Sequence, residues 1–102
     1  MALTASTLTA TVPTKNGSRY LQQLCKHWSH KFETDFDAQR GVIAFPMGPI
    51  RMAAGEETLT VTIEPEEGAD VDRFKQVVAE HLDRFAFREA PLSFDWQWIP
   101  DS

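Results

Sequence analysis

The sequence predicts an α+β fold, a two-layer sandwich in which a mostly antiparallel sheet of five to six strands carries two helices on one face. Several short segments alternate apolar and polar residues with a period of two, which is typical of half-buried strands. Two longer segments repeat apolar residues at the helical period instead. Gly and Pro turns separate the short strands and favour antiparallel neighbours. The expected order is β-α-β-β-β-β-α-β, with both helices covering one face of the sheet.

The chain of 102 residues is long enough for one domain and too short for two. We therefore expect a single domain over residues 1–102, with an ordered core from about residue 6 to residue 98. Hydrophobic residues make up 42% of the chain and charged residues 25%, which are the proportions of an ordinary globular protein.

The predicted strands cover residues 4–12, a short acidic segment near 33–37, and then residues 42–45, 50–54 and 58–64. Turns that contain Gly or Pro separate them. The alternation places threonines on one face of the sheet and apolar residues on the other. The threonines are Thr7, Thr9, Thr11, Thr58, Thr60 and Thr62, and the opposite face holds Leu8, Ala10, Val12, Leu59, Val61 and Ile63.

The first predicted helix has Ser18 as its N-cap and continues to about Phe32, and the second has Asp70 as its N-cap and continues to about Phe85. In each helix the apolar residues form one stripe that faces the core. After Pro91 a last strand is expected, in which Leu92, Phe94, Trp96 and Trp98 all point the same way.

The composition limits which partners the protein is expected to bind and in which compartment it is expected to work. The net charge is −5, with 10 Lys and Arg scattered along the chain against 15 acids, which argues against nucleic acid and an anionic membrane as partners. Cys25 is the single cysteine, so an intramolecular disulfide is impossible and a reducing compartment is suitable. The N-terminus lacks the features of a secretory signal, and no apolar run is long enough to span a membrane. Cytoplasm is the expected location.

Cys25, His27 and His30 form the most evident cluster of metal-ligating residue types. His27 and His30 are three positions apart on the predicted helix and share a face, so they could chelate one ion together. Cys25 lies roughly 160° to 200° away around the axis and cannot join them. His27 and His30 are thus candidate metal ligands, and the structural alternative is a solvated polar face.

His81 lies about 40° from the centre of the apolar stripe of the second helix. A histidine on a core face needs a hydrogen-bond partner, and a purely structural role is one interpretation. The alternative is that His81 points into a small pocket, where it would act as an acid, a base or a ligand contact.

Trp28, Trp96 and Trp98 belong to a predicted interior that is rich in aromatic rings. Packing of the core explains them, and the alternative is a shallow aromatic pocket that stacks a planar ligand. In that hypothesis His81, Trp28, Trp96 and Trp98 bind the ligand. No cofactor is required by any motif, because the glycines are isolated turn residues and no metal-binding loop is present.

Two longer strings carry a resemblance to a known family. Residues 18–31, beginning Ser18-Arg19-Tyr20, are similar to the opening motif of the bacterial family called domain of unknown function 2218. Residues 81–89, ending Phe85-Ala86-Phe87-Arg88-Glu89, together with Trp96, resemble its closing motif. Members of that family are often encountered beside siderophore-interacting flavin reductases and iron-uptake proteins, so the resemblance implies an association with siderophore or iron handling.

Three hypotheses of function follow. The first is a small non-enzymatic binding or accessory module, in siderophore or iron handling, that takes a small molecule. The second is a protein–protein interaction module that forms a homodimer through the threonine-rich face or an edge strand. The third is a small enzyme that uses His81 as an acid or base, with Arg84 or Arg88 holding an anionic substrate.

Overall fold

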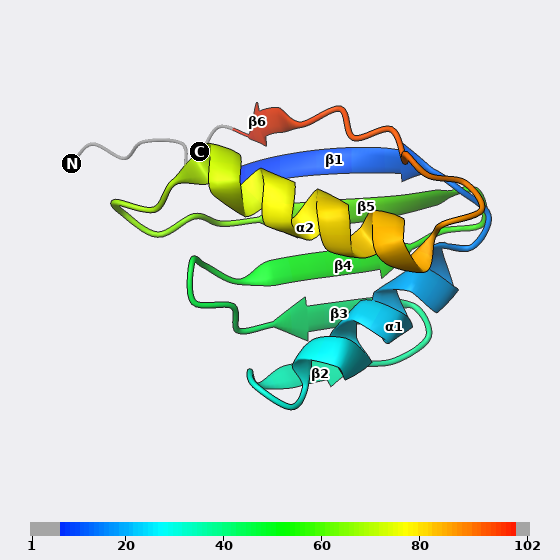
Figure 1. Ribbon diagram of the computed structural model, residues 1–102, viewed down its shortest axis with the longest axis horizontal. Helices are drawn as coiled ribbons and strands as arrows, with labels where there is room; N and C mark the ends of the chain where they lie inside the picture. Colours follow the sequence, from blue (N-terminus) through cyan, green and yellow to red (C-terminus); the bar gives the residue numbers. More distant parts are fainter. Residues whose placement is uncertain (1–6, 100–102) are drawn as a thin grey trace.

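The structure is a computed structural model that describes residues 7–99 (Figure 1). Eight elements follow one another in the order β-α-β-β-β-β-α-β, as the sequence predicts. They are β1 (Thr7–Pro13), α1 (Gly17–Trp28), β2 (Thr34–Phe36), β3 (Arg40–Ile43), β4 (Ile50–Ala54), β5 (Thr58–Ile63), α2 (Val71–Phe85) and β6 (Gln97–Ile99). The six strands form one antiparallel sheet in the order β2-β3-β4-β5-β1-β6. Both helices lie over the same face of this sheet, which confirms the predicted fold class (Figure 1).

The register of the central strands produces the predicted two faces. β1 pairs with β5 so that Leu8 lies opposite Ile63 and Val12 opposite Leu59, and all four side chains are buried beneath the helices. Thr9 and Thr62 are also opposite each other, on the other face. Successive side chains of a strand point to opposite faces, so the alternation in the sequence becomes one apolar and one polar face. The part of the predicted first strand before Thr7 lies outside the described residues.

α1 differs from the predicted helix at both ends. It begins at Gly17, with Asn16 at the N-cap position, and Ser18 is not the cap. Gly17 lies against β5, where an added Cβ would come within 3.0 Å of the Leu59 Cβ, so glycine permits this close approach. The helix ends at Trp28, four residues earlier than predicted. The chain must turn back there to place β2 beside β3, and the Ser29 hydroxyl donates to the Lys26 carbonyl at 2.8 Å in that turn.

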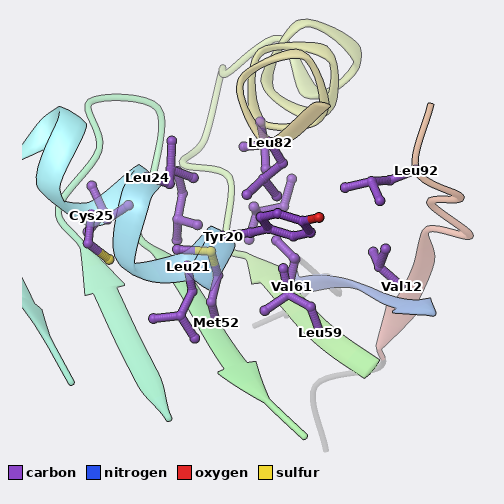
Figure 2. Packing of buried hydrophobic residues seen from close by; sticks show 14 of the residues in the cluster. Val12, Tyr20, Leu21, Leu24, Cys25, Met52, Leu59, Val61, Leu82 and Leu92 are labelled. Carbon is purple, nitrogen blue, oxygen red and sulfur yellow. The ribbon is translucent and has the colours of Figure 1, made fainter. Parts of the chain in front are cut away.

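α2 begins and ends where the sequence predicts. The Asp70 carboxylate accepts a hydrogen bond from the Arg73 backbone N–H at 3.1 Å, which satisfies one of the free donors of the first turn. Phe74, Val78 and Leu82 are fully buried and attach the helix to the sheet. The packed side chains between the two helices and the sheet form one continuous core (Figure 2).

The prediction of a long aromatic strand at the C-terminal end is wrong, because the observed strand is much shorter. β6 covers only Gln97–Ile99, because it pairs with just three residues of β1 at the edge of the sheet. Leu92 is buried, and Phe94 and Trp96 are half-buried in the connection that follows the cis peptide bond before Pro91. Trp98 lies opposite Leu8 but is 53% exposed. Within residues 7–99, neither helix has the length and apolar character needed to cross a membrane.

Candidate functional site

The two strings that the sequence singles out meet in the structure. Tyr20, from the first string, lies on α1 with its ring buried near Leu82 and Leu92 (Figure 2). Its hydroxyl donates a hydrogen bond to Oε2 of Glu89, the last residue of the second string. The start of α1 and the segment beyond the end of α2 are therefore held side by side.

Glu89 Oε2 accepts two further hydrogen bonds from the turn between β1 and α1. The Thr14 hydroxyl and the Asn16 side-chain amide each donate at 3.0 Å. Thr14 is itself buried, and its hydroxyl oxygen accepts from the Asn16 backbone N–H at 3.1 Å. Three donors thus satisfy one carboxylate oxygen, and this network holds the Glu89 side chain against α1 and the turn before it.

A cleft of about 500 Å³ opens at this junction. Its volume is in the range of small-molecule sites. Both strings supply its lining, together with one residue of the turn that precedes α1. The lining residues are Asn16, Arg19, Tyr20, Gln23, Phe85, Phe87, Arg88 and Glu89.

Two exposed arginines, Arg19 and Arg88, give the cleft its positive charge. The two ion pairs found within residues 7–99 join Arg51 to Glu64 and Lys75 to Asp72, so neither cleft arginine is neutralised by a carboxylate there. The Arg88 guanidinium lies 5.8 Å from the ring centre of Phe87, whose side chain is 72% exposed. A guanidinium that is free of carboxylates and beside an aromatic ring can bind an anionic group in a bidentate manner.

Tyr20 and Glu89 are held in fixed protonation states. Burial raises the pKa of Tyr20, and the hydrogen bond to Glu89 and its negative charge raise it further. The hydrogen bond from Tyr20 lowers the pKa of Glu89, as do those from Asn16 and Thr14. Tyr20 therefore stays neutral and Glu89 stays ionised around neutral pH.

The structure brings three of the predicted site residues together in a different place, between the middle of α2 and the end of α1. His81 is half-buried, and its Nδ1 lies 2.8 Å from the Val77 carbonyl oxygen, so Nδ1–H donates and the predicted internal partner exists. Its ring centre is 4.8 Å from that of buried Trp28 and 5.6 Å from that of exposed His27. Trp28 also packs on Phe45 at 4.7 Å, as a core residue does.

The remaining predicted site residues lie apart from this group. His30 follows the end of α1, so the expectation that His27 and His30 share a helix face is wrong. Trp96 stacks on Phe94 with ring centres 5.7 Å apart, and Trp98 lies on the edge strand β6. Cys25 is buried, and burial raises the pKa of its thiol to about 11. Over residues 7–99, no three His, Cys, Asp or Glu side chains are grouped so that they could hold a metal ion.

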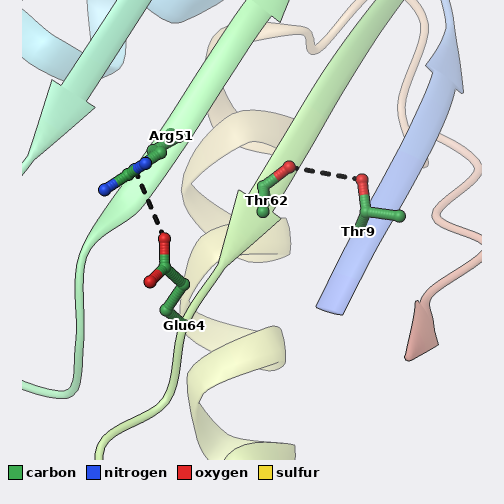
Figure 3. A network of polar contacts seen from close by, with 4 residues as sticks. All are labelled: Thr9, Arg51, Thr62 and Glu64. Atoms are coloured by element: carbon green, nitrogen blue, oxygen red, sulfur yellow. Dashed lines mark hydrogen bonds and ion pairs between the residues drawn. The ribbon is translucent and has the colours of Figure 1, made fainter. Parts of the chain in front are cut away.

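The threonine-rich face of the sheet, which no helix covers, is polar and internally bonded (Figure 3). The hydroxyls of Thr9 and Thr62 are 3.3 Å apart, and Arg51 is paired with Glu64 at 3.3 Å. A shallow depression of about 390 Å³ lies beside them, between β3, β4 and β5. On this face Arg51 is paired with a carboxylate, in contrast to Arg19 and Arg88 of the cleft.

Sequence reasoning missed the cleft, although one signal could have indicated it. Residues 1–32 contain four Lys and Arg and no Asp or Glu, whereas residues 33–102 contain six Lys and Arg and 15 acids. The first part therefore has a charge of +4 and the remainder a charge of −9, which add to the net −5. The bases are scattered along the chain, but α1 is a basic helix in an acidic protein.

Comparison with known proteins confirms the family that the two strings resemble. The family model described as an uncharacterised protein conserved in bacteria, DUF2218, matches residues 9–97. The NMR structure of PA4090 from Pseudomonas aeruginosa is similar, with 32% sequence identity and a TM-score of 0.73, over 89% of this chain and 94% of that one. No curated protein sequence matches. From its match over nearly the whole described fold, we conclude that this chain belongs to the DUF2218 family of bacterial proteins.

Proposed function

We propose that this protein is a small non-enzymatic binding module whose cleft takes a small anionic molecule with a flat apolar part. One observation supports this above the others: Arg19 and Arg88 line one cleft, and neither is paired with a carboxylate within residues 7–99. Guanidinium groups without a carboxylate partner favour anions, and the exposed ring of Phe87 offers a flat surface beside them.

Binding is favoured over catalysis by the state of the other polar groups in the cleft. General acid–base catalysis works best with a pKa near the working pH. The pKa of Tyr20 is raised and that of Glu89 is lowered, so both move away from neutrality. Glu89 is also occupied by three donors. These groups hold the cleft in shape and leave the arginines to contact the ligand.

The chemistry of the proposed ligand also fits a role in iron handling. A ferric siderophore with aromatic groups and a net negative charge has the chemistry that Arg19, Arg88 and Phe87 would recognise. In this proposal the protein works in the cytoplasm, which suits its single buried thiol, Cys25. Simple aromatic carboxylates share the same chemistry and are better first probes, because their charge can be removed without changing their shape.

Isothermal titration calorimetry with biphenyl-4-carboxylate and its neutral carboxamide tests the proposal. We expect the carboxylate to bind and the carboxamide to bind at least about tenfold more weakly, because the arginines select charge. Arg19→Ala and Arg88→Ala should each weaken carboxylate binding by about tenfold. Arg40→Ala is the matched control, because Arg40 is exposed on β3 and does not line the cleft.

Equal binding of the carboxylate and the carboxamide would contradict the proposal, as would a loss on Arg40→Ala as large as that on Arg88→Ala. A ferric catecholate siderophore and a neutral ferric hydroxamate siderophore form a second pair of probes. Preference for the anionic catecholate complex would support the iron-related form of the proposal. Binding of the carboxylate with no binding of either ferric complex would restrict the function to iron-free anions.

A further inference from the structure

Phe85 lies between the cleft and the pair formed by His27 and His81. Phe85 lines the cleft, and its ring centre is also 5.9 Å from that of His27 in an edge-on arrangement. Arg19, Gln23 and His27 are spaced by four residues, so they follow one another along the same side of α1. The side of α1 that faces α2 thus runs from Arg19 in the cleft to His27, which lies beside His81 of α2.

The surroundings of His27 are positively charged. Burial lowers the pKa of His27, and the positive charges of His81, Arg84, Lys31 and His30 lower it further. His81 and Arg84 belong to α2, whereas His30 and Lys31 follow α1, so both packed segments contribute cations. Among residues 7–99, no carboxylate is among the groups that shift the pKa of His27. Such a cluster disfavours a bound cation and favours an anion.

The orientation of His81 leaves one of its nitrogens for a ligand. A carbonyl oxygen can only accept, so the 2.8 Å contact with Val77 fixes the proton of His81 on Nδ1. Nε2 is then the nitrogen that gains a proton when the ring becomes charged, and the new N–H can donate to an anion. His27 is exposed and can turn toward the same anion.

We propose that His27, His81, Arg84 and Lys31 form a second anion-binding subsite, so that the ligand of this protein is an elongated molecule with an anionic group at each end. This inference rests on the proposed function of the cleft. Arg19 and His27 are eight positions apart, which corresponds to about 12 Å along α1. The two anionic groups are therefore about that far apart, and the flat middle of the ligand lies over Phe85 and Gln23. Binding strengthens as the pH falls and His27 gains its charge.

Biphenyl-4,4′-dicarboxylate is a rigid probe with two carboxylates about that far apart, and biphenyl-4-carboxylate is its matched one-charge control. At about pH 5.5 we expect calorimetry to show the dicarboxylate binding about tenfold more tightly than the monocarboxylate, with the ratio smaller at about pH 8. His27→Gln should reduce the ratio at the acid pH to near one. His27 is used because it is exposed, so its replacement leaves the core intact, which a circular dichroism spectrum checks.

His30→Gln is the matched control and should keep the ratio, because His30 lies beyond the helix and has the smallest effect on His27. Equal affinities of the two probes in the natural protein would overturn the second subsite while leaving the cleft in place. A ratio that His27→Gln does not change would do the same. Failure of both probes to bind at either pH would overturn the cleft and the second subsite together.

Discussion

Tyr20 on α1 donates its hydroxyl to the carboxylate of Glu89 beyond α2, across 69 positions of the sequence. This contact closes the junction at which the two family strings meet, and the ring of Tyr20 is part of the core beneath it (Figure 2). The position of the cleft therefore depends on a hydrogen bond that can be removed without changing the shape of the tyrosine side chain.

Tyr20→Phe should lower the free energy of unfolding by about 1.5 kcal/mol, because a hydrogen bond to a charged acceptor is lost. Glu89→Ala should cost more, about 2 kcal/mol, since it leaves the buried hydroxyls of Tyr20 and Thr14 without their acceptor. Urea unfolding measures both. Glu67→Ala is the control, an exposed acid in the turn before α2, and should change stability little. A loss for Glu67→Ala equal to that for Glu89→Ala would mean that the network does not stabilise the fold.

The same network makes stability depend on pH in the acid range. The pKa of Glu89 is lowered from 4.5 in the folded state, so its ionised form is favoured by folding. Its contribution is present above about pH 4.5 and is lost as the pH falls through the folded-state pKa. The difference in the free energy of unfolding between the natural protein and Glu89→Gln should therefore shrink as the pH falls below about 4.5. A difference that stays constant down to strongly acid pH would contradict the role given to the Glu89 charge.

Tyr20 offers a direct optical measurement at alkaline pH, because it is the single tyrosine of the chain. Its pKa is raised from 10.0, first by burial and then by Glu89. Near-ultraviolet absorbance of the tyrosinate should therefore rise at a higher pH than in a model peptide. Folding favours the protonated form, so this contribution to stability is present below about pH 10 and is lost as the pH rises through the folded-state pKa. Glu89→Gln should move the transition part of the way back, and an ordinary pKa in the natural protein would contradict the buried, bonded hydroxyl.

Cys25 should be unreactive in the folded protein. Burial raises the pKa of its thiol to about 11, and the thiolate is the reactive form. A thiol reagent at about pH 8 should label the folded protein far more slowly than the protein in urea, and the rate should follow the fraction unfolded. Fast labelling without denaturant would show that the face of α1 that contacts the sheet is accessible.

Local signals predicted α2 and the central strands well. Asp70 as N-cap, a continuous apolar stripe and Pro91 beyond the end all act within the segment itself, so α2 has the predicted bounds. The end of α1 depends on a tertiary requirement instead. The apolar repeat continues to Phe32, but the chain has to turn at Ser29 to bring β2 beside β3. Periodicity along the chain carries no information on that requirement.

The site could be predicted only in parts. Both strings that form the cleft stand out in the sequence, and the enzyme hypothesis names Arg84 or Arg88 as an anion contact. Their meeting depends on how α1 packs against α2, which no pattern within either string encodes. The same packing places His27 beside His81, whereas helical spacing alone pairs His27 with His30.

Mapping the binding of biphenyl-4-carboxylate on the amide nuclear magnetic resonance spectrum of labelled protein tests the anion-binding cleft most directly. We predict that the largest shift changes fall on Arg19, Gln23 and Phe87, while Thr60 and Thr62 on the opposite face of the sheet stay unmoved. Largest changes on the threonine-rich face, or the absence of change around Arg19 and Phe87 when the ligand is in excess, would contradict it.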